Sequence, residues 1–319
     1  MHAQLFQGAS VSDFFSSAVG SFLSDLRSRG YSDRTTVNYR AYLLQFRNWL
    51  FDNRGYSSLA EIGRDDLQDF CQHLALQKNR KGKLLAVSTR NNYLNALRSF
   101  FSYLVKSGHL LANPASELSN FRGQKKLPRV PSYAEILRLL AAVDSNLKGM
   151  RDRAWMEVLY GSGLRLGELL RLDLTDLCLD EELLHVRLGK GDKDRFVPFT
   201  PEAKRAIKTY LKTSRPYYAE SGLRALWVSV RGERMNRWTV SKDLHLYAKR
   251  ASLKTRITPH ILRHTCATHL LRNGASLRHI QALLGHQFLS TTQIYTRVEI
   301  TDLRDVLRRC HPRENFYEE

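Results

Sequence analysis

Four residues near the carboxyl-terminal end of the chain have side chains suited to holding and attacking one phosphate: His260, Arg263, His286 and Tyr295. Arginine and histidine direct positive charge or N–H groups at phosphoryl oxygens, and tyrosine supplies an oxygen nucleophile. Taken alone, a His-x-x-Arg pair is a weak signal, because two polar residues on an exposed helix face are common. What these residues can do therefore depends on the elements that position them.

A helix beginning at Thr258-Pro259 is expected to carry the first pair. Threonine is a favoured N-cap and proline a favoured first helical residue, which puts His260 and Arg263 one turn apart on one face. The free backbone N–H groups of a helix start favour an anion there. The opposite, buried face would be formed by Ile261, Leu262, Cys266 and Leu270.

The segment that follows is divided by capping residues. Ser276 is expected to cap a second helix, and Gly285 to end it in a left-handed conformation just before His286. Ser290 would cap a short third helix that bears Tyr295. The competing interpretation is a polar histidine in a loop and an ordinary half-buried tyrosine.

Two basic residues far upstream lie beside glycines. Arg165 follows a glycine-rich break between two expected helices, with Glu168 three residues later. Lys190 lies between two glycines in a tight polar turn joining two expected strands. Both could reach into a site. Alternatively, Arg165 is a surface arginine paired with Glu168, and Lys190 is a solvated lysine.

The charge of the chain indicates a polyanionic partner. The 319 residues include 50 Lys plus Arg against 31 Asp plus Glu, a formal charge of +19. Such an excess favours nucleic acid and a salt-dependent association. A basic protein without a specific partner remains the alternative from composition alone.

Several other classes of protein are disfavoured by the sequence. No apolar stretch approaches the ~20 residues of a membrane span, and the start lacks the pattern of a secretory signal. The four scattered cysteines have no Cys-x-x-Cys spacing, which disfavours a disulfide framework or a zinc site. We therefore expect no metal and a reduced, cytoplasmic protein, and interpret the adjacent Cys310 and His311 as part of a frayed tail.

The chain is predicted to form two domains joined by a linker, with a mainly α fold and a small β-sheet in the second domain (α+β). Apolar residues at helical spacing predict a helical first domain, 9–120, which could be no more than a bundle with a basic surface. The linker, 121–131, contains two prolines and four basic residues. The second domain, 132–319, opens with a Ser132-x-x-Glu135 capping box. The expected elements are helices at 11–26, from near 32–36 to 50, and at 64–77, 88–107, 133–143 and 151–161, strands at 183–187, 195–199 and 226–230, and helices from 200 and 239 onward.

Together and in this order, these residues closely resemble the catalytic domain of the tyrosine recombinase (phage integrase) family, particularly its Xer-like members. The matching segments span roughly 155–300, and the first domain has a length similar to the family's core-binding domain. The acidic residue that follows the family's first arginine is present as Glu168. The six catalytic positions of the family fall on Arg165, Lys190, His260, Arg263, His286 and Tyr295.

The resemblance implies that DNA strands are cut and rejoined at specific sites through a 3′-phosphotyrosyl link on Tyr295. The two arginines would clamp the phosphate, Lys190 would protonate the leaving oxygen, and the two histidines would assist proton transfer and bind the phosphate. No cofactor is implied.

The resemblance also implies an assembly. The two domains would clamp double-stranded DNA that carries specific recombination sites, and four protomers would act through a Holliday junction, as a homotetramer or mixed with a paralogue. The tail at 300–307 would dock on a neighbouring protomer, although packing within the same chain predicts the same apolar pattern. Further DNA contacts are expected from Arg90, Arg122, Lys125, Lys126 and Arg129.

Two alternatives remain open at this point: a strand-relaxing or hairpin-resolving enzyme that uses the same tyrosine, and a non-catalytic DNA-binding or architectural protein. The intact set of six residues disfavours the second. The sequence does not identify the target DNA, nor whether the role is chromosome-dimer resolution, integration, plasmid resolution or cassette exchange.

Overall fold

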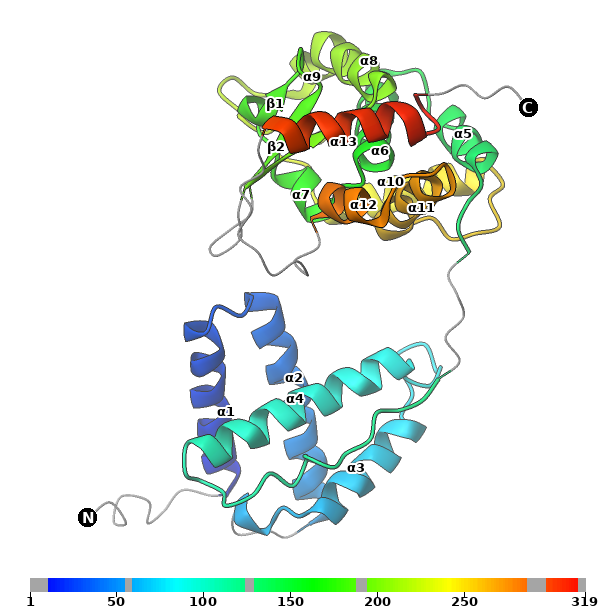
Figure 1. Cartoon of the computed structure of the whole chain (residues 1–319). Coiled ribbons are helices and arrows are strands. Elements are labelled where there is room, and N and C mark those ends of the chain that lie inside the picture. Colours follow the sequence, from blue (N-terminus) through cyan, green and yellow to red (C-terminus); the bar gives the residue numbers. More distant parts are fainter. Residues whose placement is uncertain (1–10, 55–58, 124–128, 188–193, 286–296, 315–319) are drawn as a thin grey trace. The chain divides into compact units, whose positions relative to one another are not determined.

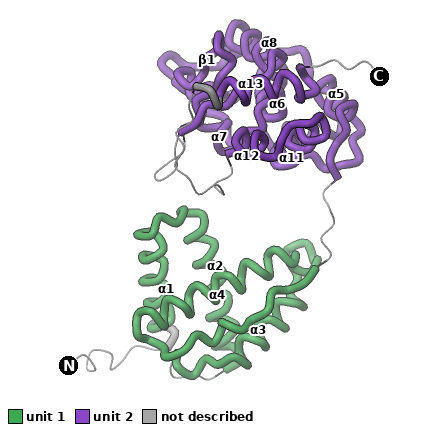
Figure 2. Tube along the Cα trace, in the orientation of Figure 1, with its two compact units in different colours: residues 1–126 green, residues 127–319 purple. Residues whose placement is uncertain are grey.

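The computed structural model describes residues 11–54, 59–123, 129–187, 194–285 and 297–314 (Figure 1). The chain divides into two compact units, residues 1–126 and 127–319 (Figure 2). The division falls inside the basic, proline-containing stretch. Each unit has its own hydrophobic core.

The first unit is helical, and its core is rich in aromatic rings. The rings of Phe15, Phe46 and Phe100 are completely buried, and the Phe15 ring lies between the other two in contact, at centroid distances of 6.2 Å from Phe46 and 5.3 Å from Phe100. Their spacing along the helices places them on inward faces, as one apolar stripe per helix requires. The helices are α1 (Val11–Ser28), α2 (Asp33–Asn53), α3 (Arg64–Leu76) and α4 (Val87–Lys106), with a 3-10 turn at Leu59–Glu61.

The second unit combines helices with a small sheet. Its long helix α6 (Leu147–Ser162) is buried around its circumference, because α8, α11 and the π-turn at Tyr210–Ser214 all pack on it. The other helices are α5 (Tyr133–Ala141), α7 (Leu166–Arg171), α8 (Pro201–Thr209), α9 (Arg215–Tyr218), α10 (Arg237–Arg250), α11 (Pro259–Arg272), α12 (Leu277–Leu284) and α13 (Arg297–Cys310). A 3-10 turn, Leu174–Asp176, precedes the sheet. The mainly α fold with a minor sheet is confirmed.

Several helix starts match their sequence signals. Ser132 and Glu135 form the expected capping box, and the Thr200 side chain accepts a hydrogen bond from the backbone of Ala203 ahead of Pro201. Two helices start two or more residues earlier than expected. Helix α6 begins at Leu147, four residues before 151, because Asn146 caps it, and α10 begins at Arg237, because Asn236 caps it.

The sheet has three antiparallel strands in the order β1-β2-β3: Leu177–Cys178, Leu183–Val186 and Arg195–Pro198. The pairing of the second and third strands was predicted, and the two-residue first strand was not. The strand expected at 226–230 is wrong. Val228 makes an isolated bridge with Arg234, because the backbone bond from Ser229 N to Glu233 O (2.7 Å) reverses the chain at once.

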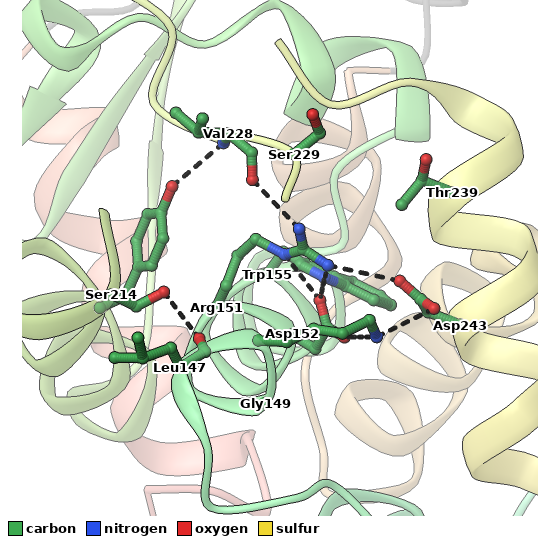
Figure 3. A network of polar contacts seen from close by, with 12 residues as sticks. Leu147, Gly149, Arg151, Asp152, Trp155, Ser214, Val228, Ser229, Thr239 and Asp243 are labelled. Carbon is green, nitrogen blue, oxygen red and sulfur yellow. Dashed lines mark hydrogen bonds and ion pairs between the residues drawn. The ribbon is translucent and has the colours of Figure 1, made fainter. Parts of the chain in front are cut away.

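A buried polar network ties α6 to α10 (Figure 3). Arg151, which has no exposed surface, pairs with Asp152 (2.7 Å) and Asp243 (3.4 Å) and donates to Val228 O (3.2 Å). Lys148 pairs with the same two carboxylates at 2.6 and 3.0 Å. Two cations therefore face two anions inside the fold.

The described residues after α13, 311–314, are not frayed, which corrects the sequence interpretation. His311 is completely buried, with Nε2 3.3 Å from Tyr160 O, and Arg313 pairs with Glu157 at 2.7 Å. Burial lowers the pKa of His311 to about 3, so this ring is neutral at physiological pH. Leu303 and Leu307 of α13 are buried in the same chain's core, so the apolar pattern is used in cis.

All four cysteines are free thiols. Within the described ranges, no helix combines the length and apolar character needed to cross a membrane.

Candidate active site

The glycine break after α6 determines the position of Arg165. Gly163 ends α6 with φ of +62°, and a Cβ there would lie 2.8 Å from Cδ2 of Leu284. Glycine is therefore required both for the left-handed backbone and for the close approach of α12. The chain then runs extended through Arg165, which is the N-cap residue of α7.

A buried carboxylate holds Arg165 in place. Glu168 is 3% exposed and accepts hydrogen bonds from the Arg165 backbone N (2.8 Å) and Nη1 (2.9 Å). Arg165 Nη2 also donates to Gly285 O at 3.0 Å. Because 42% of the Arg165 side chain remains exposed, its guanidinium can still meet a ligand.

A second arginine reaches the same carboxylate from the sheet. Arg195, at the start of β3, donates from Nη1 and Nη2 to the two oxygens of Glu168, both at 3.1 Å. Its side chain is 2% exposed. This residue was missed by the sequence analysis. The available signal was its place in the alternating strand, on the side of buried Val197, where a charged side chain needs a partner.

The third arginine lies one turn into α11, which begins where Thr258 accepts from Ile261 N and Pro259 occupies the first helical position. Arg263 donates from Nη1 to Gly163 O and from Nη2 to Leu284 O, both at 2.7 Å. Its Nη1 lies 4.0 Å from Glu168. Two backbone carbonyls thus orient this guanidinium.

The charges in this cluster are unbalanced. Arg165, Arg195 and Arg263 surround one carboxylate, Glu168. Burial and the neighbouring Arg165 lower the pKa of Arg263 to about 10, so it still carries its charge at neutral pH. Burial tends to raise the pKa of Glu168, but the hydrogen bond and charge of Arg195, with the bonds from Arg165, lower it below its usual value. The net positive charge suits an anionic ligand.

The structure therefore brings Arg165, Glu168 and Arg263 together from segments about a hundred residues apart. His260 lies on the same helix as Arg263 and is exposed. The remaining predicted residues of the site, Lys190, His286 and Tyr295, lie outside the described residues.

The candidate DNA contacts of the first unit and the linker have mixed surroundings. The Arg90 guanidinium lies 5.0 Å from the centroid of the Phe121 ring, which gives it a partner within its own unit. Arg122 is exposed, and Arg129 pairs with Glu135 at 3.3 Å while 60% of its side chain stays exposed. Lys125 and Lys126 are not among the described residues.

Over the described ranges, no group of three or more His, Cys, Asp or Glu side chains could hold a metal ion.

Two family models match the chain. The model of the phage integrase family matches residues 132–301, and that of the phage integrase N-terminal SAM-like domain matches residues 19–108.

Similar structures include two recombinases in complex with DNA. The crystal structure of XerH site-specific recombinase bound to a palindromic difH substrate has a TM-score of 0.73 at 20% identity, covering 97% of this chain and 99% of that one. A lambda integrase tetramer bound to a Holliday junction has a TM-score of 0.66 at 19% identity, covering 88% and 80%. At these identities the likeness shows the fold alone.

Curated relatives are similar over most of their length. Tyrosine recombinase XerD of Pseudomonas aeruginosa is 41% identical over 290 residues, covering 89% of this chain and 93% of the relative. Tyrosine recombinase XerC of Vibrio atlanticus is 40% identical over 298 residues, covering 92% of each. The chain therefore belongs to the phage integrase family and is a tyrosine recombinase of the Xer type.

Proposed function

We propose that this recombinase cuts and rejoins double-stranded DNA at specific sites, with Tyr295 as the nucleophile. The observation that carries the proposal is the arginine cluster: two guanidiniums, Arg165 and Arg263, converge on one place while Arg165 stays 42% exposed. Phosphoryl transfer depends mostly on positioning and on neutralising charge, which such a pair provides.

In the proposed reaction the two arginines bind the non-bridging oxygens of the scissile phosphate. Arg263 uses two of its five N–H groups on backbone carbonyls, which leaves three for a phosphate. The phenol oxygen of Tyr295 bonds to phosphorus as the bond to the 5′ oxygen breaks. The products are a 3′-phosphotyrosyl link and a free 5′-hydroxyl, and the reverse reaction reseals the strand.

The remaining residues are assigned to proton transfer. Lys190 donates a proton to the leaving 5′ oxygen, His260 takes the proton from the phenol, and His286 donates a hydrogen bond to the phosphate. One phosphoester replaces another, so the exchange needs no external energy source and no cofactor.

The domains are proposed to divide the work. Residues 9–120 form a core-binding domain, 121–131 a basic linker and 132–319 the catalytic domain. Arg90, Arg122, Lys125, Lys126 and Arg129 would contact the DNA backbone. Four protomers would act on two sites through a Holliday junction, either as a homotetramer or with a paralogue, in the cytoplasm. The supporting observations are the charge of +19 and the resemblance to recombinases solved on DNA.

A nicked suicide duplex tests the chemistry. Release of a short fragment beyond the nick traps the covalent protein–DNA adduct, which a denaturing gel resolves. We expect adduct with the wild-type protein and none with Tyr295→Phe. Tyr217→Phe is the matched control, because Tyr217 is a 72% exposed tyrosine in the short helix α9. DNA binding without any wild-type adduct would favour the architectural alternative.

A two-site plasmid tests strand exchange. Recombinant product from a plasmid with two target sites supports recombination, whereas relaxation without product would indicate a strand-relaxing enzyme. Crosslinking on a Holliday junction, alone and with a candidate paralogue, then reports the composition of the tetramer.

A further inference from the structure

Arg195 is the most deeply buried arginine of the catalytic cluster, and no role in the reaction has been assigned to it. Its side chain is 2% exposed, so it cannot present its charge to DNA as the 42% exposed Arg165 can. Both of its terminal nitrogens are bonded to Glu168 in a bidentate pair. Any effect on a phosphate must therefore pass through Glu168.

Glu168 connects Arg195 to Arg165. Its Oε1 accepts from Nη1 of both arginines, at 2.9 Å from Arg165 and 3.1 Å from Arg195. Its Oε2 accepts from the Arg165 backbone and from Arg195 Nη2. Since the bidentate pair fixes both carboxylate oxygens, it also fixes the point to which Arg165 is anchored.

Arg195 also contacts the end of α12. A Cβ on Gly285 would lie 2.8 Å from Arg195 Cζ and 2.9 Å from Nε, so the guanidinium rests directly on the glycine backbone. The same glycine carbonyl accepts from Arg165 at 3.0 Å. Among the described residues, Arg195 Nε is buried and has no hydrogen-bond partner. The flat guanidinium thus lies between Glu168 and Gly285, two groups that both bond Arg165.

We propose that Arg195 is a positioning residue for strand cleavage, which holds Glu168 so that Arg165 is presented to the scissile phosphate. It also links this anchor to the hairpin, since Arg195 opens β3 and follows Lys190 by five positions in the chain. This inference rests on the proposed function. The competing explanation is that Arg195 only neutralises a buried carboxylate so that the unit folds.

Single-turnover cleavage of the nicked duplex separates the two explanations, with the dissociation constant for the same DNA measured in parallel. Displacing a reacting group by about 1 Å costs roughly 10²-fold in rate. We expect Arg195→Met to lower the cleavage rate about 100-fold, while the dissociation constant changes by less than about threefold. Arg187→Met is the matched control, because Arg187 directly follows β2, the strand paired with β3, and its side chain pairs with Asp176 at 2.6 Å. It should cleave at the wild-type rate.

The pH dependence of cleavage provides a readout that a purely structural role would not move. The charged groups facing Glu168 in the described structure are Arg165, Arg195 and Arg263, from the α6–α7 link, β3 and α11. The pKa of Glu168 is lowered in the native cluster, so its anchoring is present above that pKa and lost as pH falls through it. Without Arg195, burial is less opposed and the pKa rises. The acid limb of the Arg195→Met rate profile should therefore move to higher pH, and that of Arg187→Met should stay in place.

Arg195→Lys and a double variant complete the test. Lysine restores one charge without the bidentate geometry, so we expect wild-type binding and an intermediate cleavage rate. If Arg195→Met does not unfold cooperatively, Arg195→Lys decides the question, and cleavage by Arg195→Lys at the wild-type rate overturns the proposal.

If Arg195→Met does fold, adding Glu168→Gln to it should lower the cleavage rate little further. Independent, multiplicative losses in rate would overturn the proposed coupling of Arg195 and Glu168. Absence of adduct with the wild-type protein would instead refute the proposed function itself.

Discussion

Two buried ionic clusters in the second unit differ in balance and in exposure. Around Arg151 and Asp152, two cations meet two anions, and neither of these two side chains has exposed surface. Around Glu168, three arginines meet one carboxylate, and one of them is 42% exposed. The first cluster is complete within the protein. The second cluster has an excess of positive charge, and the exposed part of Arg165 makes that charge accessible to a ligand. A binding site for an anion requires both.

This comparison yields opposite expectations for the same kind of substitution. Removing a charge from the balanced cluster should affect folding, since it leaves an uncompensated charge in the interior. Removing the exposed arginine from the unbalanced cluster should affect the reaction and not folding, since that charge contributes little to the stability of the protein.

The largest expected effect is on stability. Arg151→Met leaves Lys148 as the cation that pairs with both Asp152 and Asp243, and breaking a buried pair costs about 3–5 kcal/mol. We expect the free energy of unfolding, measured with urea, to fall by that amount, while cleavage per folded molecule is unchanged. A loss below about 1 kcal/mol would mean that this network stabilises the protein no more than an exposed ion pair does. The proposed difference between the two clusters would then be contradicted.

Next in size is the effect of Arg165→Ala on the reaction. Removing one preorganised charge from a transition-state site costs about 10²–10³-fold in rate. We expect that loss in single-turnover cleavage, and a change in unfolding free energy below about 1 kcal/mol, since the pair with Glu168 is partly exposed. Arg171→Ala, an exposed arginine of the same helix, is the control. Equal losses from both variants would contradict a specific role for Arg165.

A smaller effect is expected from Gly285→Ala. The left-handed backbone, with φ of +65°, costs alanine about 1–2 kcal/mol, and the new Cβ would press on Arg195. Gly274→Ala is a matched control, because its φ is +90° and a Cβ there meets nothing within 4 Å. Both variants should lose similar stability by urea unfolding, and only Gly285→Ala should also cleave more slowly. Equal cleavage by the two would show that Arg195 tolerates displacement.

The smallest effect is expected outside both clusters. Arg250 pairs with Asp144 at 2.8 Å, with side chains 43% and 45% exposed, so water and salt screen the pair. Arg250→Ala should leave the thermal midpoint and the cleavage rate within experimental error. A measurable loss in the thermal midpoint or the cleavage rate would mean that burial and charge balance do not by themselves predict which ion pairs matter for stability and which for the reaction.

Local signals predicted the parts of the fold that depend on neighbours in sequence. The caps at Ser132, Thr200 and Thr258 were identified because a capping side chain bonds a backbone N–H only a few residues away. The strand predicted at 226–230 was wrong because Leu226, Trp227 and Val228 are buried by packing and not by pairing in a sheet. Sequence alternation does not distinguish these two reasons for being apolar.

The tail after α13 also shows that local sequence patterns do not predict burial by distant parts of the chain. The sequence interpretation placed Cys310 and His311 in a frayed tail, yet His311 and the nearby Arg313 are both buried. Their partners, Tyr160 and Glu157, lie some 150 residues earlier, and no short-range pattern shows that pairing.

By itself, the sequence determined the chemical types available to the site, its family and the left-handed stop at Gly285, because residue type and short spacing carry these directly. Only the tertiary structure decided that Arg195 belongs to the cluster and that Glu168 receives two arginines at once. The physical reason is distance along the chain: Arg165, Arg195 and Arg263 become neighbours only when the α6–α7 link, β3 and α11 come together. The excess of positive charge that could hold a phosphate is therefore a property of that packing.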